Sequence, residues 1–239
     1  FFSSHKSPKF VPTIKQLKSG QMQLQNNQAL IRKYNVPGPR YTSYPSVPYW
    51  NKEGINQSQW ISTFQRAFTE SNDTEGISLY IHLPFCESLC TFCGCHKHIT
   101  KRHEVEQPYI DAVLKEWQLY LNLLPSRPHI KELHLGGGTP TFFSSTELSR
   151  LINGIFAGAK LCEAPELSFE GHPNHTSYEQ LETLFQLGCS RCSFGVQDYD
   201  PLVQKTIHRI QPFEAVKQVT DWAREIGYTS ISHDLIFGL

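Results

Sequence analysis

The sequence has no long apolar run, no net charge and, in its first 52 residues, no acidic side chain. A membrane-spanning helix needs about 20 consecutive apolar residues, and no run approaches that length, so we expect no membrane span. No short apolar run follows a basic start, which excludes a typical secretory signal. Lys and Arg together number 22, as do Asp and Glu, and this balance argues against nucleic-acid binding through bulk positive charge. These absences favour a cytoplasmic protein that binds no nucleic acid.

The balanced total hides an uneven distribution of charge. The first 52 residues carry eight Lys and Arg, which leaves 14 basic and 22 acidic groups in residues 53–239. Residues 1–28 are rich in Ser, Lys, Gln and Asn and show no period, so we expect a loosely ordered extension. A transit peptide is the alternative, since such segments are poor in acidic residues. The chain lacks an initiator methionine and stops directly after an apolar run, so we expect it to be a fragment.

From residue 77 onward, short apolar strands alternate with amphipathic helical patterns. Strands are expected at 77–83, 132–135, 166–171, 191–196 and 230–236, and helices at about 105–124, from 144, over 176–188 and over 212–226. Ser144 with Glu147 and Thr176 with Glu179 are predicted capping boxes. Five strands joined by four helical crossovers predict a parallel α/β sheet, either doubly wound or part of a (β/α) barrel. In both architectures ligands bind at the carboxyl ends of the strands.

Four of the seven cysteines fall within ten positions in the loop after the first predicted strand: Cys86, Cys90, Cys93 and Cys95. Thiolates three and four residues apart on such a loop can converge on one metal centre. Disulfides are uncommon in cytosolic proteins, and structural zinc normally uses two separated Cys or His pairs. Zinc stays open as an alternative, because His96 and His98 follow closely. An iron–sulfur cluster normally takes four thiolates, so three cysteines in a Cys-x3-Cys-x2-Cys spacing would leave one iron open for a non-protein ligand.

That spacing, with Phe92 just before the third cysteine, resembles the signature of radical S-adenosylmethionine enzymes. Further motifs occur in an order and at spacings similar to those of the oxygen-independent coproporphyrinogen III oxidase family: Pro37-Gly38-Pro39-Arg40-Tyr41-Thr42, Tyr80 to Cys86, Gly136-Gly137-Gly138-Thr139-Pro140-Thr141, Gly195-Val196-Gln197-Asp198 and Asp234 to Leu239. The resemblance covers residues 29–239, roughly the N-terminal half of such an enzyme. Heme-chaperone-like relatives share the cluster and the glycines, but typically lack a cysteine at the position of Cys95 and the Pro-Gly-Pro-Arg-Tyr-Thr segment.

The resemblance implies a partial (β/α) TIM-like barrel of the radical S-adenosylmethionine type, truncated after about the fifth strand. It divides the chain into the extension at 1–28, an N-terminal arm at 29–76 and the incomplete barrel at 77–239. It also implies that Cys86, Cys90 and Cys93 hold a [4Fe–4S] cluster whose fourth iron is chelated by S-adenosylmethionine. A second molecule of S-adenosylmethionine binds nearby in the family.

Three residues are expected to be catalytic by this resemblance. Tyr80 would lie beside the cluster-bound cofactor, His82 would tune the cluster from the same strand face, and Cys95 would lie near the second cofactor. The implied cofactor-binding residues are Tyr80, Phe92, Gly137, Gly138, Thr139, Glu170, Gln197, Arg209 and Asp234. His172 departs from the family pattern, in which Asp or Asn usually precedes the proline.

The implied reaction converts two propionate side chains of coproporphyrinogen III to vinyl groups, giving protoporphyrinogen IX in heme biosynthesis. A 5′-deoxyadenosyl radical would take a hydrogen from each propionate, and loss of CO2 and one electron would complete the vinyl group. The expected partners are coproporphyrinogen III, an electron donor and an electron acceptor, and we expect a monomer. The alternatives are another radical enzyme acting on a tetrapyrrole, a heme-binding chaperone without oxidase activity, and a zinc-only module.

Overall fold

The computed structural model describes residues 27–35, 47–50, 54 and 56–239. The chain divides into two compact units, Phe1–Gly54 and Ile55–Leu239. The described part of the first unit contains a helix at residues 27–34 and the 3-10 helix η1 (Val47–Tyr49). Nearly all of the predicted extension at 1–28 and the whole Pro-Gly-Pro-Arg-Tyr-Thr segment lie outside the described residues. The division at residues 28 and 76 therefore stays a prediction.

The second unit contains six α-helices, a five-stranded sheet and a two-stranded sheet within its described residues. The helices are α2 (Gln57–Ser71), α3 (Glu106–Leu123), α4 (Ser145–Gly158), α5 (Tyr178–Gln186), α6 (Pro201–Thr206) and α7 (Phe213–Ile226). The larger sheet consists of β1 (Ile77–Leu83), β4 (His129–Gly137), β5 (Lys160–Gly171), β6 (Arg191–Gln197) and β7 (Ser230–Leu235). The smaller sheet pairs β2 (Phe85–Cys86) with β3 (His98–Ile99), and short 3-10 helices occur at η2 (His103–Val105), η3 (Pro140–Phe142) and η4 (Pro173–His175). No helix in the described part of the chain is long and apolar enough to cross a bilayer.

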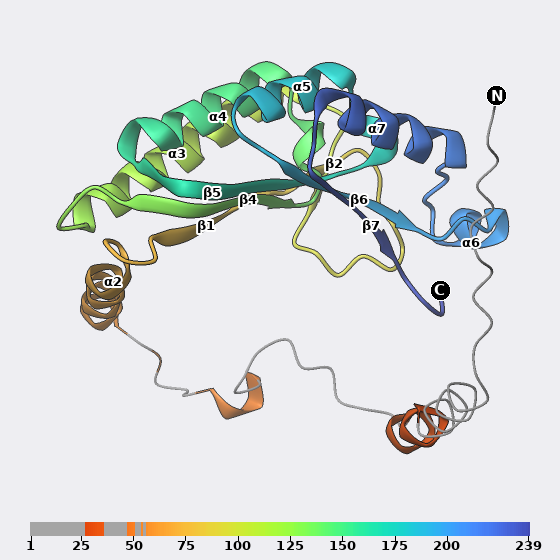
Figure 1. Ribbon diagram of the computed structural model, residues 1–239, viewed down its shortest axis with the longest axis horizontal. Coiled ribbons are helices and arrows are strands. Elements are labelled where there is room, and N and C mark those ends of the chain that lie inside the picture. The colour runs from red at the N-terminus through yellow and green to blue at the C-terminus, as the bar shows by residue number, and fades with distance from the viewer. Residues whose placement is uncertain (1–26, 36–46, 51–53, 55) are drawn as a thin grey trace, which may run out of the picture. The chain divides into compact units, whose positions relative to one another are not determined.

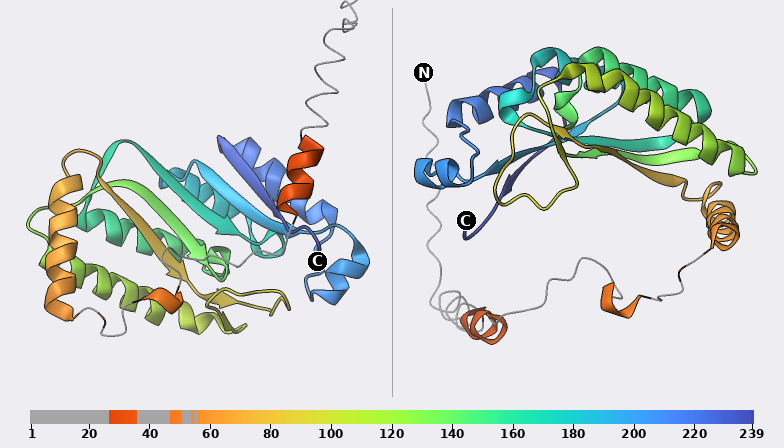
Figure 2. Two further views of the ribbon diagram at one scale, coloured as in Figure 1. Left: turned by 90° about the horizontal axis from the view of Figure 1, so that it is seen from below. Right: turned by 180° about the vertical axis from the view of Figure 1, so that it is seen from behind.

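The five-stranded sheet distinguishes between the two architectures that the sequence left open. Its order is β1-β4-β5-β6-β7, which follows the order of these strands in the chain, and every neighbouring pair is parallel. Helices α3, α4, α5 and α7 all lie on one face of this sheet (Figure 1), as the two further views in Figure 2 also show. A doubly wound sheet reverses its strand order and carries helices on both faces. The predicted partial (β/α) barrel is therefore confirmed, and the doubly wound alternative is wrong.

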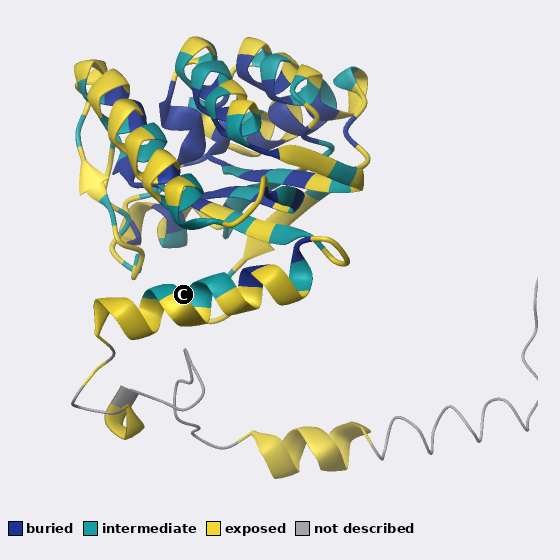
Figure 3. Cartoon of the chain, turned by 90° about the vertical axis from the view of Figure 1, so that its left-hand side faces the viewer, coloured by how far each residue is buried: buried dark blue, intermediate teal, exposed yellow. Residues whose placement is uncertain are grey.

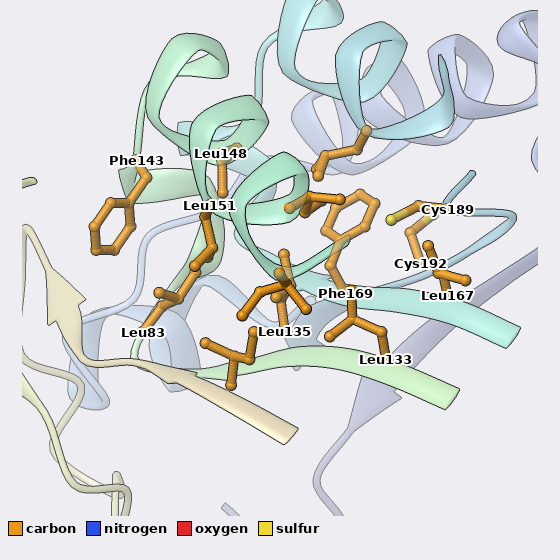
Figure 4. Packing of buried hydrophobic residues seen from close by; sticks show 14 of the residues in the cluster. Leu83, Leu133, Leu135, Phe143, Leu148, Leu151, Leu167, Phe169, Cys189 and Cys192 are labelled. Carbon is orange, nitrogen blue, oxygen red and sulfur yellow. The ribbon is translucent and has the colours of Figure 1, made fainter. Parts of the chain in front are cut away.

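The hydrophobic core lies between the sheet and the four covering helices, as the side chains in Figure 4 show. Helix α4 contributes Leu148, Leu151, Ile152 and Ile155, which repeat at helical spacing and are buried. Alternate residues of the strands meet this stripe, among them Leu133, Leu135, Leu167 and Phe169. Figure 3 shows the buried residues of these helices turned towards the sheet and the exposed residues turned away. Because strand residues alternate, the polar side chains between these apolar positions face the opposite side of the sheet, the inside of the barrel.

The helices differ from the sequence prediction in several features, of which the first is α6, a helix that was not expected. The predicted arm at 29–76 contains the helix α2, which begins with a capping box formed by Asn56 and Gln59. The capping box that opens α5 consists of Ser177 and Gln180, so the prediction of Thr176 with Glu179 is wrong by one residue. The physical reason is that the Thr176 hydroxyl is buried and used elsewhere, donating to the carbonyl oxygen of His172. Of the predicted capping box of Ser144 with Glu147, the Ser144 side chain does accept a hydrogen bond from the backbone of Glu147. The reciprocal bond is wrong, because the backbone N–H of Ser144 donates to the Glu106 carboxylate instead.

Candidate functional site

A cavity of about 400 Å³ opens at the carboxyl ends of the strands. Its walls come from the loop after β1, the ends of β4, β5, β6 and β7, and the segment after α6. All of the site residues expected from the sequence line it except Tyr80 and His82: Cys86, Cys90, Phe92, Cys93, Cys95, Gly137, Gly138, Thr139, Glu170, Gln197, Arg209 and Asp234. The barrel thus gathers into one cavity residues that are spread over most of the second unit.

The loop from Cys86 to Cys95 is tied to its surroundings at several points. Cys86 Sγ lies 3.4 Å from the hydroxyl of Thr139, at the end of β4. The backbone N–H of Thr91 donates to a carbonyl oxygen of the segment after α6 at 3.0 Å, and Lys97 Nζ donates to the carbonyl oxygen of Cys93 at 3.0 Å. Burial raises the pKa of the Cys86 thiol, so the protonated form is favoured until a metal replaces the proton.

All seven cysteines are free thiols in the structure, so the cysteine loop keeps its full set of candidate ligands. Among the described residues, no three His, Cys, Asp or Glu side chains are close enough together to hold one metal ion. In an iron–sulfur cluster each cysteine binds a different iron. We refer to Cys86, Cys90 and Cys93 as the cluster cysteines.

The triple glycine at the end of β4 brings the backbone of that strand against the cysteine loop. Gly137 has a φ of +123°, a conformation that favours glycine. A Cβ atom added to Gly138 would lie only 2.5 Å from the carbonyl oxygen of Pro84, so this position leaves no room for a side chain. The bare backbone here, which we call the glycine cradle, packs against the segment that leads into the cysteine loop and lines the cavity.

Arg209 contacts the thiol of a cluster cysteine from the segment after α6. Its Nη2 donates to the carbonyl oxygen of Gly195 at 2.6 Å, and its Nη1 lies 3.6 Å from Cys90 Sγ. Within the described residues its Nε is buried and has no hydrogen-bond partner. An arginine N–H left without an acceptor in a cavity wall fits a ligand carboxylate, because guanidinium–carboxylate hydrogen bonds are among the strongest in proteins.

Two further predicted cofactor-binding residues end the last two strands. Gln197 ends β6 with a φ of +72°, a strained conformation for a residue with a side chain, and such strain is commonest at functional sites. Asp234 lies on β7 opposite Gly195 in the strand register and is exposed. Both side chains therefore reach the same cavity from the far side of the barrel.

Tyr80 and His82 lie on β1 and line a different, larger cavity of about 610 Å³ between α2, β1 and α3. His82 Nε2 lies 2.7 Å from the carbonyl oxygen of His96, which can only accept, so Nε2 carries the proton. His82 Nδ1 then accepts from the Tyr80 hydroxyl at 3.0 Å. Burial and the negative charge of Glu170 raise the pKa of Tyr80, which keeps its hydroxyl protonated. These two residues are linked to the cysteine loop through His96, and the His82 ring also packs against Gly137 in the wall of the first cavity.

Several polar residues at the site were not foreseen from the sequence. His175 lines the cavity and its Nδ1 lies 3.3 Å from a carboxylate oxygen of Glu87, directly after Cys86. His134 on the neighbouring strand β4 and Ser168 on the same strand as Glu170 lie within hydrogen-bond distance of each other. The sequence signal that pointed to His134 was its place between Leu133 and Leu135, two apolar residues of a strand.

His172, the departure from the family pattern, is buried in the cavity wall with 8% of its surface exposed. Burial lowers its pKa to about 2, and the charges of Arg209 and His175 contribute. The ring is therefore neutral, and its Nδ1 accepts a hydrogen bond from the backbone of Asn174 at 3.2 Å.

The barrel and its cysteine loop define a radical S-adenosylmethionine protein. The family model described as the Radical SAM superfamily matches residues 80–239, and the chain belongs to that superfamily. Within it, the chain is a homologue of oxygen-independent coproporphyrinogen III oxidase, as the family resemblance predicted. It is 42% identical over 210 residues to the enzyme of that name from Helicobacter pylori, covering 87% of this chain and 45% of the relative. The Escherichia coli enzyme is 38% identical over 211 residues, covering 88% of this chain and 45% of the relative.

A solved structure of coproporphyrinogen III oxidase from Escherichia coli superimposes on this chain with a TM-score of 0.75 and 35% sequence identity. The superposition covers 89% of this chain and 46% of that structure. The chain therefore spans less than half the length of the relatives that it matches.

Proposed function

We propose that the full-length protein catalyses the oxygen-independent oxidative decarboxylation of coproporphyrinogen III to protoporphyrinogen IX, in heme biosynthesis. One observation carries the proposal: a single cavity at the carboxyl end of the barrel is lined by the three cluster cysteines, the glycine cradle and the acidic and basic residues of the later strands. The relatives named oxygen-independent coproporphyrinogen III oxidase, which are about 40% identical to the chain, support coproporphyrinogen III as the substrate. The expected electron donor, electron acceptor, cytoplasmic location and monomeric state belong to this proposal.

Different residues of the cavity would hold the cluster and the parts of S-adenosylmethionine. The cluster cysteines would hold a [4Fe–4S] cluster, which with bound S-adenosylmethionine supplies a 5′-deoxyadenosyl radical able to remove hydrogen from a propionate. Gly137 and Gly138 would let the methionine part of the cofactor approach the end of β4, and Thr139 would lie beside it. The carboxylate of Glu170 would accept hydrogen bonds from the amino group of S-adenosylmethionine.

The opposite wall suits a second molecule of S-adenosylmethionine. The unpartnered N–H of Arg209 would bind a carboxylate there, and the ends of β6 and β7 would contribute Gln197 and Asp234. Phe92 and Cys95 line the cavity from the cysteine loop. Burial raises the pKa of the Cys95 thiol, with the neighbouring Cys93 adding to the shift, so Cys95 is held as a thiol rather than a thiolate.

The test uses full-length protein reconstituted with iron and sulfide without oxygen, then supplied with coproporphyrinogen III, S-adenosylmethionine and a one-electron reductant. Conversion of two propionates to vinyl groups, with release of 5′-deoxyadenosine, is the expected result. The matched control is Cys90→Ala, in which both products should disappear. Stoichiometric heme binding by the parent protein with no vinyl product would instead establish the chaperone alternative.

A further inference from the structure

A row of side chains crosses three strands on the inner face of the barrel. In the strand register Tyr80 of β1 pairs with His134 of β4, and His134 pairs with Ser168 of β5. The next residue of β4, Leu135, faces the opposite side and is fully buried under the helices. Glu170 follows Ser168 by two residues and shares its face, so the row leads directly into the candidate cofactor site.

His134 connects Ser168 to Glu170 through its two ring nitrogens. Nε2 lies 3.4 Å from Glu170 Oε1, and Nδ1 lies 2.8 Å from Ser168 Oγ. A carboxylate oxygen only accepts, so Nε2 carries a proton and donates it to Glu170. In the neutral ring Nδ1 is then an acceptor for the Ser168 hydroxyl. The Glu170 carboxylate thus selects the tautomer of His134, and the Ser168 hydroxyl holds the far side of the ring by donating to Nδ1.

Glu170 receives a second donor from the same strand. The backbone nitrogen of Gly137 lies 3.4 Å from Glu170 Oε2 and donates to it, so each carboxylate oxygen accepts a hydrogen bond from a residue of β4. The Tyr80 ring stacks on His134 with centroids 5.9 Å apart and 20° between the planes, which restricts rotation of the imidazole. The hydrogen bond from His134 is the largest cause lowering the pKa of Glu170. With 46% of its side chain still exposed, Glu170 is a fixed carboxylate that a ligand can reach.

We propose that His134 is a positioning residue, which holds Glu170 in the orientation that receives the amino group of S-adenosylmethionine, while the hydrogen bond from Ser168 restrains the His134 ring. The inference rests on the proposed function, which assigns Glu170 to that amino group. His134 itself makes no contact with the cofactor in this scheme, and its effect is transmitted through the carboxylate.

The experiment measures S-adenosylmethionine affinity by isothermal titration calorimetry with full-length, anaerobically reconstituted protein. His134→Asn keeps a polar group near Ser168 but removes the N–H at the Nε2 position, and its affinity should fall about tenfold, as expected for losing a hydrogen bond to a charged group. His134→Gln returns an N–H near Glu170 and should bind within about threefold of the parent. His129→Asn, at the other end of β4, should bind as the parent, and iron content should be equal in all four proteins.

The pH dependence of binding separates positioning from a general structural role. Loss of affinity in acid reports protonation of Glu170, so removal of the His134 donor should move that loss to higher pH. The ionisable groups that face Glu170 are Tyr80 and His82 from β1, Cys95 from the cysteine loop and His134 itself. The variant His134→Asn keeps Tyr80, His82 and Cys95. A shift in the pH at which half of the affinity is lost is therefore assigned to the missing His134 donor.

Each result of these titrations has a defined meaning. If His134→Asn matches the parent in affinity and in acid midpoint while Glu170→Gln binds weakly, the positioning role is refuted and the proposed function stands. If Glu170→Gln also binds as the parent, the assignment of Glu170 is wrong. A parent protein with full iron content that binds no S-adenosylmethionine overturns the proposed function itself. Ser168→Ala, which removes one oxygen, replaces His134→Asn if that variant does not fold, and an affinity equal to that of the parent would likewise refute the inference.

Discussion

Replacing Gly138 by alanine should damage both the stability of the barrel and its capacity for iron. The new Cβ would lie 2.5 Å from the carbonyl oxygen of Pro84 and 2.9 Å from that of Phe85, whereas ordinary contact begins at 3.4 Å. The backbone must therefore separate by about 0.9 Å. The N–H groups of Gly138 and Thr139 donate to carbonyl oxygens of Leu83 and Phe85 at 2.9 and 3.0 Å, so this movement stretches both bonds. Overpacking costs about 1–3 kcal/mol, and weakening the two hydrogen bonds together costs about as much as losing one, about 1 kcal/mol. We therefore expect the free energy of unfolding to fall by about 2–4 kcal/mol.

The assay combines urea unfolding of the full-length protein with its iron content after anaerobic reconstitution. Iron should fall in Gly138→Ala, because the displaced segment continues into Cys86. Gly154→Ala is the matched control: its Cβ also meets an atom at 2.5 Å, but that atom is a terminal methyl of Leu114 between α3 and α4. The end of a side chain can move, and alanine is more favourable than glycine in a helix by about 1 kcal/mol. The free energy of unfolding of Gly154→Ala should therefore stay within about 1 kcal/mol of the parent, and its iron content should equal that of the parent. If Gly138→Ala has the same free energy of unfolding and the same iron content as the parent, the reasoning is refuted.

Three further predictions concern the cysteines, a buried histidine and the core. Alanine in place of any one cluster cysteine should abolish iron binding on reconstitution, whereas Cys95→Ala should retain it; iron loss in Cys95→Ala would make Cys95 a ligand. His172 has a pKa of about 2 in the folded protein against an ordinary 6.5, so protonation of the unfolded chain weakens folding as the pH falls below about 6.5. When the pH is lowered from 7 to 5, the free energy of unfolding of His172→Asn, measured by urea titration, should therefore fall by about 2 kcal/mol less than that of the parent. If both proteins lose the same free energy of unfolding, burial does not keep the ring neutral. Phe169→Ala should cost about 3–5 kcal/mol in denaturant titrations because the ring is fully buried, and a cost below 1 kcal/mol would place it outside the core.

The strand pattern was predictable where the strands are short and buried. Strand β6 was expected at 191–196 and spans Arg191–Gln197, since the alternation of Cys192, Phe194 and Val196 with less apolar residues is typical of a strand with one face buried. Strand β5 begins at Lys160, six residues before its predicted start. Its first half contains Ala164 with a φ of +49°, followed by Pro165, and the register with β4 shifts there. An irregularity of this kind interrupts the alternation of apolar residues, so periodicity alone does not reveal it.

The candidate site was predictable to the extent that its residues belong to short motifs at strand ends. Motif residues such as Cys86, Gly138 and Arg209 meet because the carboxyl ends of neighbouring parallel strands share one edge. The pairing of His134 with Ser168 depends instead on the register between β4 and β5, which no local pattern encodes. The sequence therefore indicated which groups line the cavity, but not which side chains hold those groups in place.

The hydrogen bond from the Thr91 N–H to the carbonyl oxygen of Ile207 has a consequence for how the protein is made. The cysteine loop is anchored to a segment synthesised more than a hundred residues later. At about 5–20 residues per second, the loop leaves the ribosome on the order of ten seconds before its anchor exists. During that interval the thiols lack the wall that later encloses them. Iron insertion is thus expected to follow synthesis of β6 and α6, as a late event in the maturation of the nascent chain.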